Sequence, residues 1–478
     1  MNQRTIVAAG SAALLLVAGV ASARNMHCAG GVQYYYQAMN DKAKGNKEDY
    51  EREIAKAVNQ LQMCASEDSL DFEAIGLLGK AYAEVDSAAD AGIAFASSIR
   101  GLEAKGDKKK LDIVRLDRLA SWVRWNNDGI TKIQAAQQMT DELPVKAGAE
   151  LNDSQKDAMK SLDAAEGQLR RATQVLPDSI SSTRMLGYVY YLRGDFVGAD
   201  NILREGLRRD PGNKALLDMQ RVARRQYAQQ LLDGKKYDEA IAYYTQILKE
   251  TPDDGGLHAN VGEAYMQKAQ TAGNANKNAD WKASGLAYGK ASDLKPEDAD
   301  MAFMAAQSLR NAGELGTAEK YWRLALKNKP DDQDALLNLA RNLNEMQQGG
   351  EAVNVLLANI KEAGPKSKDL FRELGLVYGK LNNAGKSSEM LILSIAIDRG
   401  TAAADPAAAA KTAKAGSGAA NTFTALGAPD AVYDWAAESR KHQTWVYQAK
   451  KQAFTFDVGA GMTLVQKTDW SSSGLTKK

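Results

Sequence analysis

The sequence is poor in the residues and motifs that carry out chemistry. Its 478 residues include two cysteines and three histidines, and the formal net charge is +1. His27, His258 and His442 lie far apart, and the sequence has no C-x-x-C-H, G-x-S-x-G, H-E-x-x-H or P-loop motif. A net charge near zero gives no electrostatic reason to bind nucleic acid. We therefore expect a protein that is not an enzyme, with no catalytic residues, no metal and no cofactor.

Long apolar runs are also missing, except at the start of the chain. Residues 6–20 are small and apolar, and Ala21-Ser22-Ala23 has the A-x-A form of a cleavage site. This predicts a signal peptide over residues 1–23 and an exported chain, periplasmic or outer-membrane-associated, with secretion possible. An uncleaved anchor is the alternative, because residues 5–23 are nearly long enough to span a membrane.

What the sequence does have is a recurring helical unit, clearest over residues 183–211. Leu186 and Tyr190 lie four residues apart, on one face of a helix. The small residues Gly187 and Ala199 allow two antiparallel helices to approach closely, and a proline ends the unit. A pair of helices of this kind cannot bury its apolar face alone, so it must stack on copies of itself.

The copies can be followed by two spacings. A step of 13 residues joins Tyr82 to Phe95, Tyr190 to Leu203, Leu231 to Tyr244, Leu309 to Trp322, Leu343 to Leu356 and Tyr378 to Leu391. The prolines Pro177, Pro211, Pro252, Pro296, Pro330 and Pro365 follow at intervals of 34, 41, 44, 34 and 35 residues. We assign the 41-residue interval to a first helix extended before Tyr227, and the 44-residue interval to a protruding polar loop within residues 267–280.

These residues resemble the tetratricopeptide-repeat (TPR) family over roughly residues 30–400. The resemblance implies an all-α superhelical solenoid of about nine helical hairpins, holding a protein or peptide in a groove lined by the first helices. Carried onto this chain, the groove comprises Arg184, Tyr188, Tyr191, Arg225, Gln229, Glu263, Met266, Gln307, Arg310, Arg341, Asn344, Arg372 and Lys380. This face leans basic from Arg310 onward, and an ordinary solvated helix face is the alternative interpretation.

The start of the mature chain is predicted to be a cap. Residues 24–66 contain two amphipathic segments, 30–43 and 46–63, that predict a helical hairpin. An antiparallel hairpin brings the start of its first helix near the end of its second, where Cys28 and Cys64 lie. In an exported protein this favours a disulfide, and two free thiols are the alternative.

Residues 67–177 are predicted to be TPR-like repeats with an insertion, followed by a TPR array over residues 178–400. Ile113, Leu116, Leu119, Trp122 and Val123 form an apolar helical stripe. A second helix ends at residue 177. The segment between the two helices is predicted to be an insertion, helical only at residues 130–139, because it contains Gly129, Pro144 and Gly148.

The C-terminal part differs in composition. Residues 401–424 are rich in Ala and Gly and are predicted to be a flexible linker. Residues 425–478 are predicted to hold a helix at 429–451, carrying Trp435 and Trp445, and a β-hairpin at 454–466. The hairpin must pack either on this chain's own array or on a partner's sheet edge, because a lone hairpin is marginally stable.

Two functions follow from these expectations. One is a non-enzymatic exported scaffold that binds a protein or peptide partner in its groove. The other is a permanent structural subunit of a cell-envelope or outer-membrane-associated assembly, docked through the repeat surface and the tail. Neither partner identity nor oligomeric state can be derived from the sequence.

Overall fold

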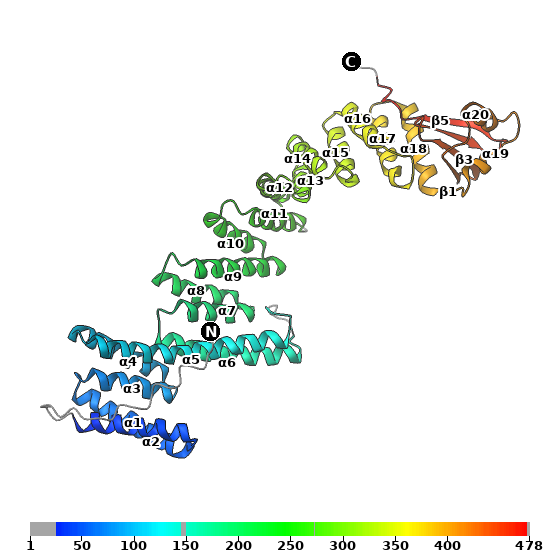
Figure 1. Ribbon diagram of the computed structural model, residues 1–478. Helices are drawn as coiled ribbons and strands as arrows, with labels where there is room; N and C mark the ends of the chain where they lie inside the picture. The colour runs from blue at the N-terminus through cyan, green and yellow to red at the C-terminus, as the bar shows by residue number, and fades with distance from the viewer. Residues whose placement is uncertain (1–24, 145–149, 272, 476–478) are drawn as a thin grey trace. The chain divides into compact units, whose positions relative to one another are not determined.

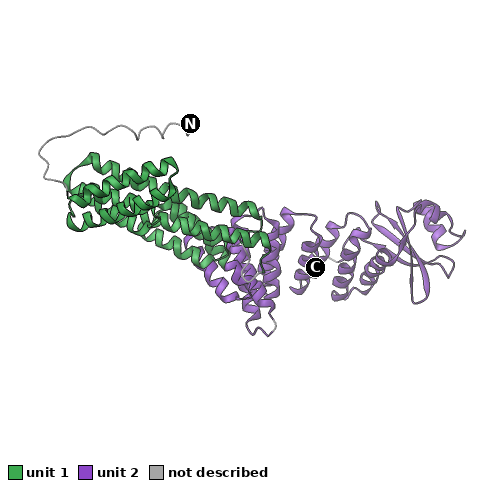
Figure 2. Cartoon of the chain, turned by 90° about the horizontal axis from the view of Figure 1, so that it is seen from below, with its two compact units in different colours: residues 1–227 green, residues 228–478 purple. Residues whose placement is uncertain are grey.

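A computed structural model describes residues 25–144, 150–271 and 273–475. The predicted signal peptide and Gly148 lie outside these residues. The chain forms two compact units, residues 1–227 and 228–478 (Figure 2). Within the described ranges no helix is both long and apolar enough to cross a membrane.

The repeat region consists of consecutive helices, most of which pack pairwise (Figure 1). The helices of its first half are α1 (Met26–Lys44), α2 (Lys47–Glu67), α3 (Phe72–Glu84), α4 (Ala88–Lys105), α5 (Lys108–Met139), α6 (Asp153–Val175), α7 (Ile180–Leu192), α8 (Phe196–Arg209) and α9 (Lys214–Asp233). Those of the second half are α10 (Tyr237–Glu250), α11 (Gly255–Gln270), α12 (Lys277–Leu294), α13 (Ala299–Asn311), α14 (Leu315–Asn328), α15 (Gln333–Glu345), α16 (Gly349–Asn359), α17 (Lys368–Lys380) and α18 (Ala384–Arg399), with a short 3-10 helix at Pro365–Ser367. Over the described residues, α1 to α18 follow one another as nine successive pairs, as the sequence predicts.

The α7–α8 pair shows why the recurring residues form this fold. Leu186 and Leu203 are buried between the two helices. A Cβ built on Gly187 would lie 2.8 Å from the Leu203 side chain, so a larger residue would push the helices apart. Asp195 begins α8 by accepting a hydrogen bond from the Gly198 amide, at 2.8 Å. The pattern read from the sequence is therefore the packing seam of the hairpin.

The N-terminal hairpin contains the predicted cystine. Cys28 lies in the first turn of α1 and Cys64 in the last turn of α2, and the structure joins them in a disulfide. Both residues are fully buried. The bridge closes a loop of 36 residues, which stabilises the cap by about 3–4 kcal/mol on the chain-entropy estimate.

The predicted insertion in the third hairpin is wrong in its first part, which belongs to a helix; the described residues between the two helices are 140–144 and 150–152. α5 is one continuous helix of 32 residues, and it packs along α6, which has 23 residues. Gly129 does not break α5, because its missing side chain admits Leu169 of α6: a Cβ there would lie 2.7 Å from that side chain. The extra residues lengthen both helices, and the helices end near Pro144, which follows Leu143 through a cis peptide bond.

The two long proline intervals have related explanations. α9 has 20 residues where α7 has 13, which confirms the extended first helix before Tyr227. The loop predicted at residues 267–280 is largely wrong. α11 reaches Gln270 and α12 begins at Lys277, so most of the additional residues extend helices.

The C-terminal part corrects two expectations. The predicted linker contains strand β1 (Thr401–Ala402) and helices α19 (Pro406–Lys411) and α20 (Gly418–Leu426). The predicted helix at 429–451 is instead two strands, β2 (Ala431–Ala437) and β3 (Arg440–Tyr447), so Trp435 and Trp445 lie on strands. The predicted hairpin is present as β4 (Gln452–Asp457) and β5 (Thr463–Asp469). All five strands form one antiparallel sheet in sequence order.

This sheet packs on the last hairpin of the array. One face contributes Tyr433, Val446 and Ala453 to the core that α17 and α18 share, and helices α19 and α20 cover the other face. Trp470, which follows β5, is fully buried and meets the Phe371 ring edge-on, with 5.4 Å between ring centroids. In the structure, therefore, the C-terminal part docks on its own array.

Candidate protein-binding surfaces

The groove residues implied by the family resemblance all lie on first helices of hairpins. Arg184, Tyr188 and Tyr191 are on α7, Arg225 and Gln229 on α9, Glu263 and Met266 on α11, Gln307 and Arg310 on α13, Arg341 and Asn344 on α15, and Arg372 and Lys380 on α17. Their surroundings differ between the two units.

In the N-terminal unit, α7 presents aromatic surface. The Tyr188 and Tyr191 rings are stacked, with 6.0 Å between their centroids. The Tyr188 hydroxyl accepts a hydrogen bond from Gln137 of α5 at 3.0 Å. Arg184 is exposed beside them. This part of the predicted face can therefore contact a partner.

In the C-terminal unit, the three predicted arginines are already ion-paired within the chain. Arg310 of α13 pairs with Glu345 of α15. Arg341 Nε lies 2.9 Å from Glu373 Oε2 of α17, and the Glu373 side chain is almost completely buried. These pairs join successive first helices, so they act as links within the array and leave little charge to attract an acidic segment.

Other predicted residues are also engaged by this chain. Arg372 pairs with Asp369 one turn earlier in α17. Glu263 accepts a hydrogen bond from Gln267 at 3.0 Å, and Asn344 is buried. Of the predicted set in this unit, Gln307 and Lys380 are exposed with no such ion pair among the described residues.

An exposed apolar face of the N-terminal unit lies on α5, along the apolar stripe that the sequence shows. Ile113 is 51% exposed, Leu116 64% and Val123 38%. Ala120 and Asn127 are exposed on the same face. The spacing of these five positions is 3, 4, 3 and 4 residues, which is the repeat of a coiled-coil seam. We call this set the α5 seam.

A pocket opens at the N-terminal end of the α5 seam. It has a volume of about 160 Å³ and lies between α1, α3 and α5, with Val32, Tyr36, Leu77 and Ile113 among its lining residues. Two ion pairs between α3 and α5 flank it. Lys110 Nζ lies 3.0 Å from Glu73 Oε2, and Lys80 Nζ lies 3.0 Å from Asp117 Oδ1.

Comparisons with known proteins give low similarity over part of the chain. No protein-family model matches. The Protein O-mannosyl-transferase TMTC3 of Mus musculus is 26% identical over 165 residues, which cover 32% of this chain and 17% of that protein. The chain thus matches less than a fifth of that relative.

Among solved structures, the TPR protein YrrB matches 41% of this chain and 91% of its own, with 19% identity and a TM-score of 0.32. MamA matches 35% of this chain and 92% of its own, with 16% identity and a TM-score of 0.29. PilF of Pseudomonas aeruginosa matches 54% of this chain and 98% of its own, with 18% identity and a TM-score of 0.26.

The fold of residues 26–399 rests on this chain's own helices, which follow one another as successive pairs. Phe95, Leu203 and Leu309, which belong to the 13-residue step, are buried. The chain carries an array of TPR-like helical hairpins. Arrays of this kind are interaction scaffolds, in which each hairpin adds surface to a shared face.

The α5 seam of the TPR array was missed as a surface because an apolar stripe on a helix normally marks a core. One signal in the sequence could have revealed it. Leu111, Val114 and Trp125 supply a second apolar face on the same helix, and that face is the buried one. A helix needs only one apolar face to pack on its neighbours, so a second apolar face is available for another contact.

The array also contains one group of potential metal ligands within the described residues, namely Cys28, Cys64 and Asp71. Two of the histidines make hydrogen bonds of their own: His27 Nδ1 lies 2.9 Å from Gln60 Oε1, and His258 Nε2 lies 2.8 Å from the Pro252 carbonyl oxygen. Nothing in this arrangement assembles a nucleophile, a base and an oxyanion site.

Proposed function

We propose that this protein is a non-enzymatic exported scaffold whose N-terminal unit binds a helix of a protein partner on the α5 seam. The observation that carries the proposal is the exposure of Ile113, Leu116 and Val123 on one face of a rigid helix. Exposed aliphatic residues in a contiguous row mark interaction sites in soluble proteins.

The spacing of the seam indicates a helical partner. From Ile113 to Asn127 the seam covers 15 residues, and its two ends are about 21 Å apart along the helix. Positions separated by three and four residues match the a and d positions of a second helix, whereas an extended strand would present side chains every two residues. Asn127 adds a polar group at the end of the row. In coiled coils, a single polar residue at such a position fixes the register of the two helices.

The charges beside the seam favour an uncharged apolar face on the partner. Asp117 pairs with Lys80, and Arg124 lies 3.9 Å from Glu84. Because these groups are paired within the chain, an acidic or basic segment would gain little from them. The pocket near Ile113 then accepts one apolar side chain of the partner helix.

The proposal that the chain is exported rests on the A-x-A segment at residues 21–23 and on the buried cystine. We expect the mature chain to begin at Arg24 and to lie in the periplasm or at the outer membrane. Intact-mass measurement of the chain from its host tests this, because an uncleaved chain would retain the mass of residues 1–23.

Site-specific photo-crosslinking tests the binding site. A photoreactive residue replaces Leu116 in the full chain, expressed in its own host, and adducts are identified by mass spectrometry. We expect one main partner, crosslinked within an amphipathic helix. Leu116→Asp together with Val123→Asp, with the photoreactive residue moved to Ala120, should reduce that adduct about tenfold or more.

Ile93 provides the matched control. It is 69% exposed on α4, a second helix of the same unit. The photoreactive residue placed there should not yield the same adduct, and Ile93→Asp should leave the adduct at Ala120 unchanged. Equal adducts from positions 116 and 93, or no adduct from position 116, would show that the α5 seam is not the binding site.

The second candidate, a permanent subunit docked through the repeat surface and the tail, draws less support. Tyr433, Val446 and Trp470 of the tail are buried in the core that this chain's own α17 and α18 share. A chain that purifies as a soluble monomer favours the scaffold, and insolubility without a partner favours the subunit.

A further inference from the structure

The side chains of the α5 seam differ in size along its length. Ile113 and Leu116 are large, Ala120 is small, and Val123 is of intermediate size. All four residues are exposed. A small residue between two larger ones leaves a hole on the face of a helix, and in knobs-into-holes packing a side chain of the facing helix fills such a hole.

A second recess lies one heptad earlier, where the pocket of about 160 Å³ opens beside Ile113. Ile113 and Ala120 are seven residues apart, or about 10 Å along the helix axis. The walls of the pocket combine apolar side chains with the two ion pairs that join α3 to α5. The four charges of these ion pairs cancel, so the pocket favours an uncharged aliphatic or aromatic side chain.

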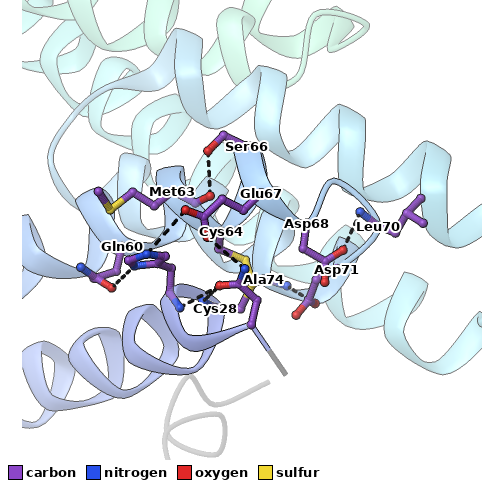
Figure 3. Close-up of a disulfide and its surroundings, with 12 residues drawn as sticks. Cys28, Gln60, Met63, Cys64, Ser66, Glu67, Asp68, Leu70, Asp71 and Ala74 are labelled. Carbon is purple, nitrogen blue, oxygen red and sulfur yellow. Dashed lines mark hydrogen bonds and ion pairs between the residues drawn. A yellow bond between two sulfur atoms is a disulfide. The ribbon is translucent and has the colours of Figure 1, made fainter. Parts of the chain in front are cut away.

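The disulfide holds one wall of this pocket in place. It joins Cys28 at the start of α1 to Cys64 at the end of α2 (Figure 3). Val32 lies one turn after Cys28 and Tyr36 one turn later, and both line the pocket. Because α1 is tied to α2 at this end, the pocket is formed before a partner binds, which lowers the cost of binding.

A positive charge lies at the pocket end of the seam. Lys109 precedes Ile113 by four residues, so it lies on the same face of α5, and it is exposed. Among the described residues Lys109 makes no ion pair, whereas the neighbouring Lys110 is paired with Glu73. At the other end of the seam Asn127 is uncharged. The charge along the seam is therefore one-sided.

We propose that the partner helix, whose binding to the α5 seam is the proposed function on which this rests, carries a defined set of three side chains. Two are bulky and apolar and lie seven residues apart. One of them fills the pocket beside Ile113, and the other fills the hole at Ala120. The third is an acidic residue, three or four residues beyond the side chain in the pocket, and its carboxylate pairs with Lys109.

The three contacts together fit a helix in one direction. Equivalent positions on a helix of a coiled coil recur every seven residues, which is the spacing of the two recesses. The carboxylate then selects the direction, because a helix placed the other way round would bring it to the uncharged end at Asn127. An exposed ion pair contributes little to affinity, so Lys109 acts mainly on direction and the recesses on affinity.

Filling the hole distinguishes shape from simple apolar attraction. Ala120→Leu adds apolar surface, yet it should lower the adduct formed by a photoreactive residue at position 116 about tenfold or more, because the partner's side chain is displaced. Ala55→Leu, at an exposed alanine of α2, is the matched control and should leave the adduct unchanged. Equal or stronger crosslinking by Ala120→Leu would overturn the proposal.

Lys109→Glu tests the charged end. It should lower the adduct about threefold or more at low salt, and the loss should shrink as salt is added, because salt screens exposed charges. Replacing the partner's acidic residue by lysine should restore the adduct of this variant. Arg100→Glu, at an exposed arginine of α4, is the control and should have no effect. An adduct unchanged by Lys109→Glu would exclude the carboxylate.

The sequence of the crosslinked helix separates this proposal from the proposed function. We expect the two bulky apolar residues seven positions apart, with the acidic residue next to the one that is nearer Ile113. A crosslinked helix without this spacing would overturn the three-residue set and leave the α5 seam as a binding site. No adduct from position 116 of the otherwise unchanged chain would remove both.

Discussion

The two units of this protein use the same repeat but present different surfaces. On α5 of the N-terminal unit, aliphatic side chains face solvent. On α13, α15 and α17 of the C-terminal unit, arginines are paired with carboxylates of this chain, and the chain's own tail packs beside them. The repeat pattern fixes the buried seam of each hairpin and leaves the outer face free to vary. Binding capacity therefore has to be judged hairpin by hairpin.

The largest expected effect is at the docked tail of the C-terminal unit. Trp470 is 1% exposed, so Trp470→Ala should destabilise this unit by about 3–5 kcal/mol. Hydrogen exchange should show lost protection in α17 and α18, because they share a core with Trp470. Leu464→Ala is the control, since Leu464 is exposed on β5 and should change stability by about 0.5 kcal/mol or less. Equal protection in both variants would mean that the tail is not docked.

The next effect concerns the ion-paired face. Arg341→Glu places a carboxylate beside the buried Glu373 and should destabilise the C-terminal unit by about 2–3 kcal/mol. Arg341→Met removes the charge without adding repulsion and should cost less. Chemical denaturation of both variants gives the comparison. If Arg341→Glu were as stable as the wild type, Arg341 would be available to a partner and the contrast between the units would fail.

In the N-terminal unit, Glu166 of α6 lies in a hydrogen-bonded cluster with residues of α6 and α7. Burial would raise the pKa of Glu166, but hydrogen bonds from Tyr190, Arg193 and Arg170 outweigh burial and lower the pKa to about 2. Its ordinary value is 4.5, so this contribution to stability is complete above about pH 4.5 and is lost as the pH falls towards 2.

Glu166→Gln should therefore flatten the acid side of the stability curve. The difference in unfolding free energy between wild type and variant should be about 1–3 kcal/mol near neutral pH and should shrink between pH 4.5 and 2. Hydrogen exchange of the α6 and α7 amides, measured during denaturation at each pH, gives this difference in unfolding free energy. A difference that does not change with pH would show that Glu166 acts through shape and not through its charge.

The smallest effect should be on the α5 seam itself. Leu116 is 64% exposed, so Leu116→Ser should change the stability of the isolated protein by about 0.5 kcal/mol or less. Thermal unfolding of the purified chain tests this. A loss of several kcal/mol would mean that Leu116 is part of a core, and the proposed site would have to be abandoned.

The hairpin array could be predicted because its signal is local. Gly187, Leu203 and their equivalents recur at a fixed step, and each contact joins neighbouring helices. The extension of α9 followed from the same counting. The insertion in the third hairpin failed because Gly129 was interpreted as a helix breaker, whereas it is a contact point for Leu169. Spacing alone cannot distinguish a glycine that ends a helix from one that another helix packs against.

The C-terminal sheet was mostly missed for a different reason. Val432 and Tyr433 are both buried although they point to opposite faces, because helices cover both sides of the sheet. A strand buried on both faces loses its alternation, and the sequence then resembles a helix. The ion pairing of Arg341 was equally hidden, since its partner Glu373 lies 32 residues away.

The sheet that packs on α18 also affects whether copies of this protein associate end to end at high concentration. A stack of hairpins ends in an apolar face that another stack could extend, and so a chain made only of repeats can grow into filaments. Here Tyr433, Val446 and Trp470 occupy that last face. The sheet therefore serves as the C-terminal cap of the array, and concentrated solutions should not form polymers through this end of the chain.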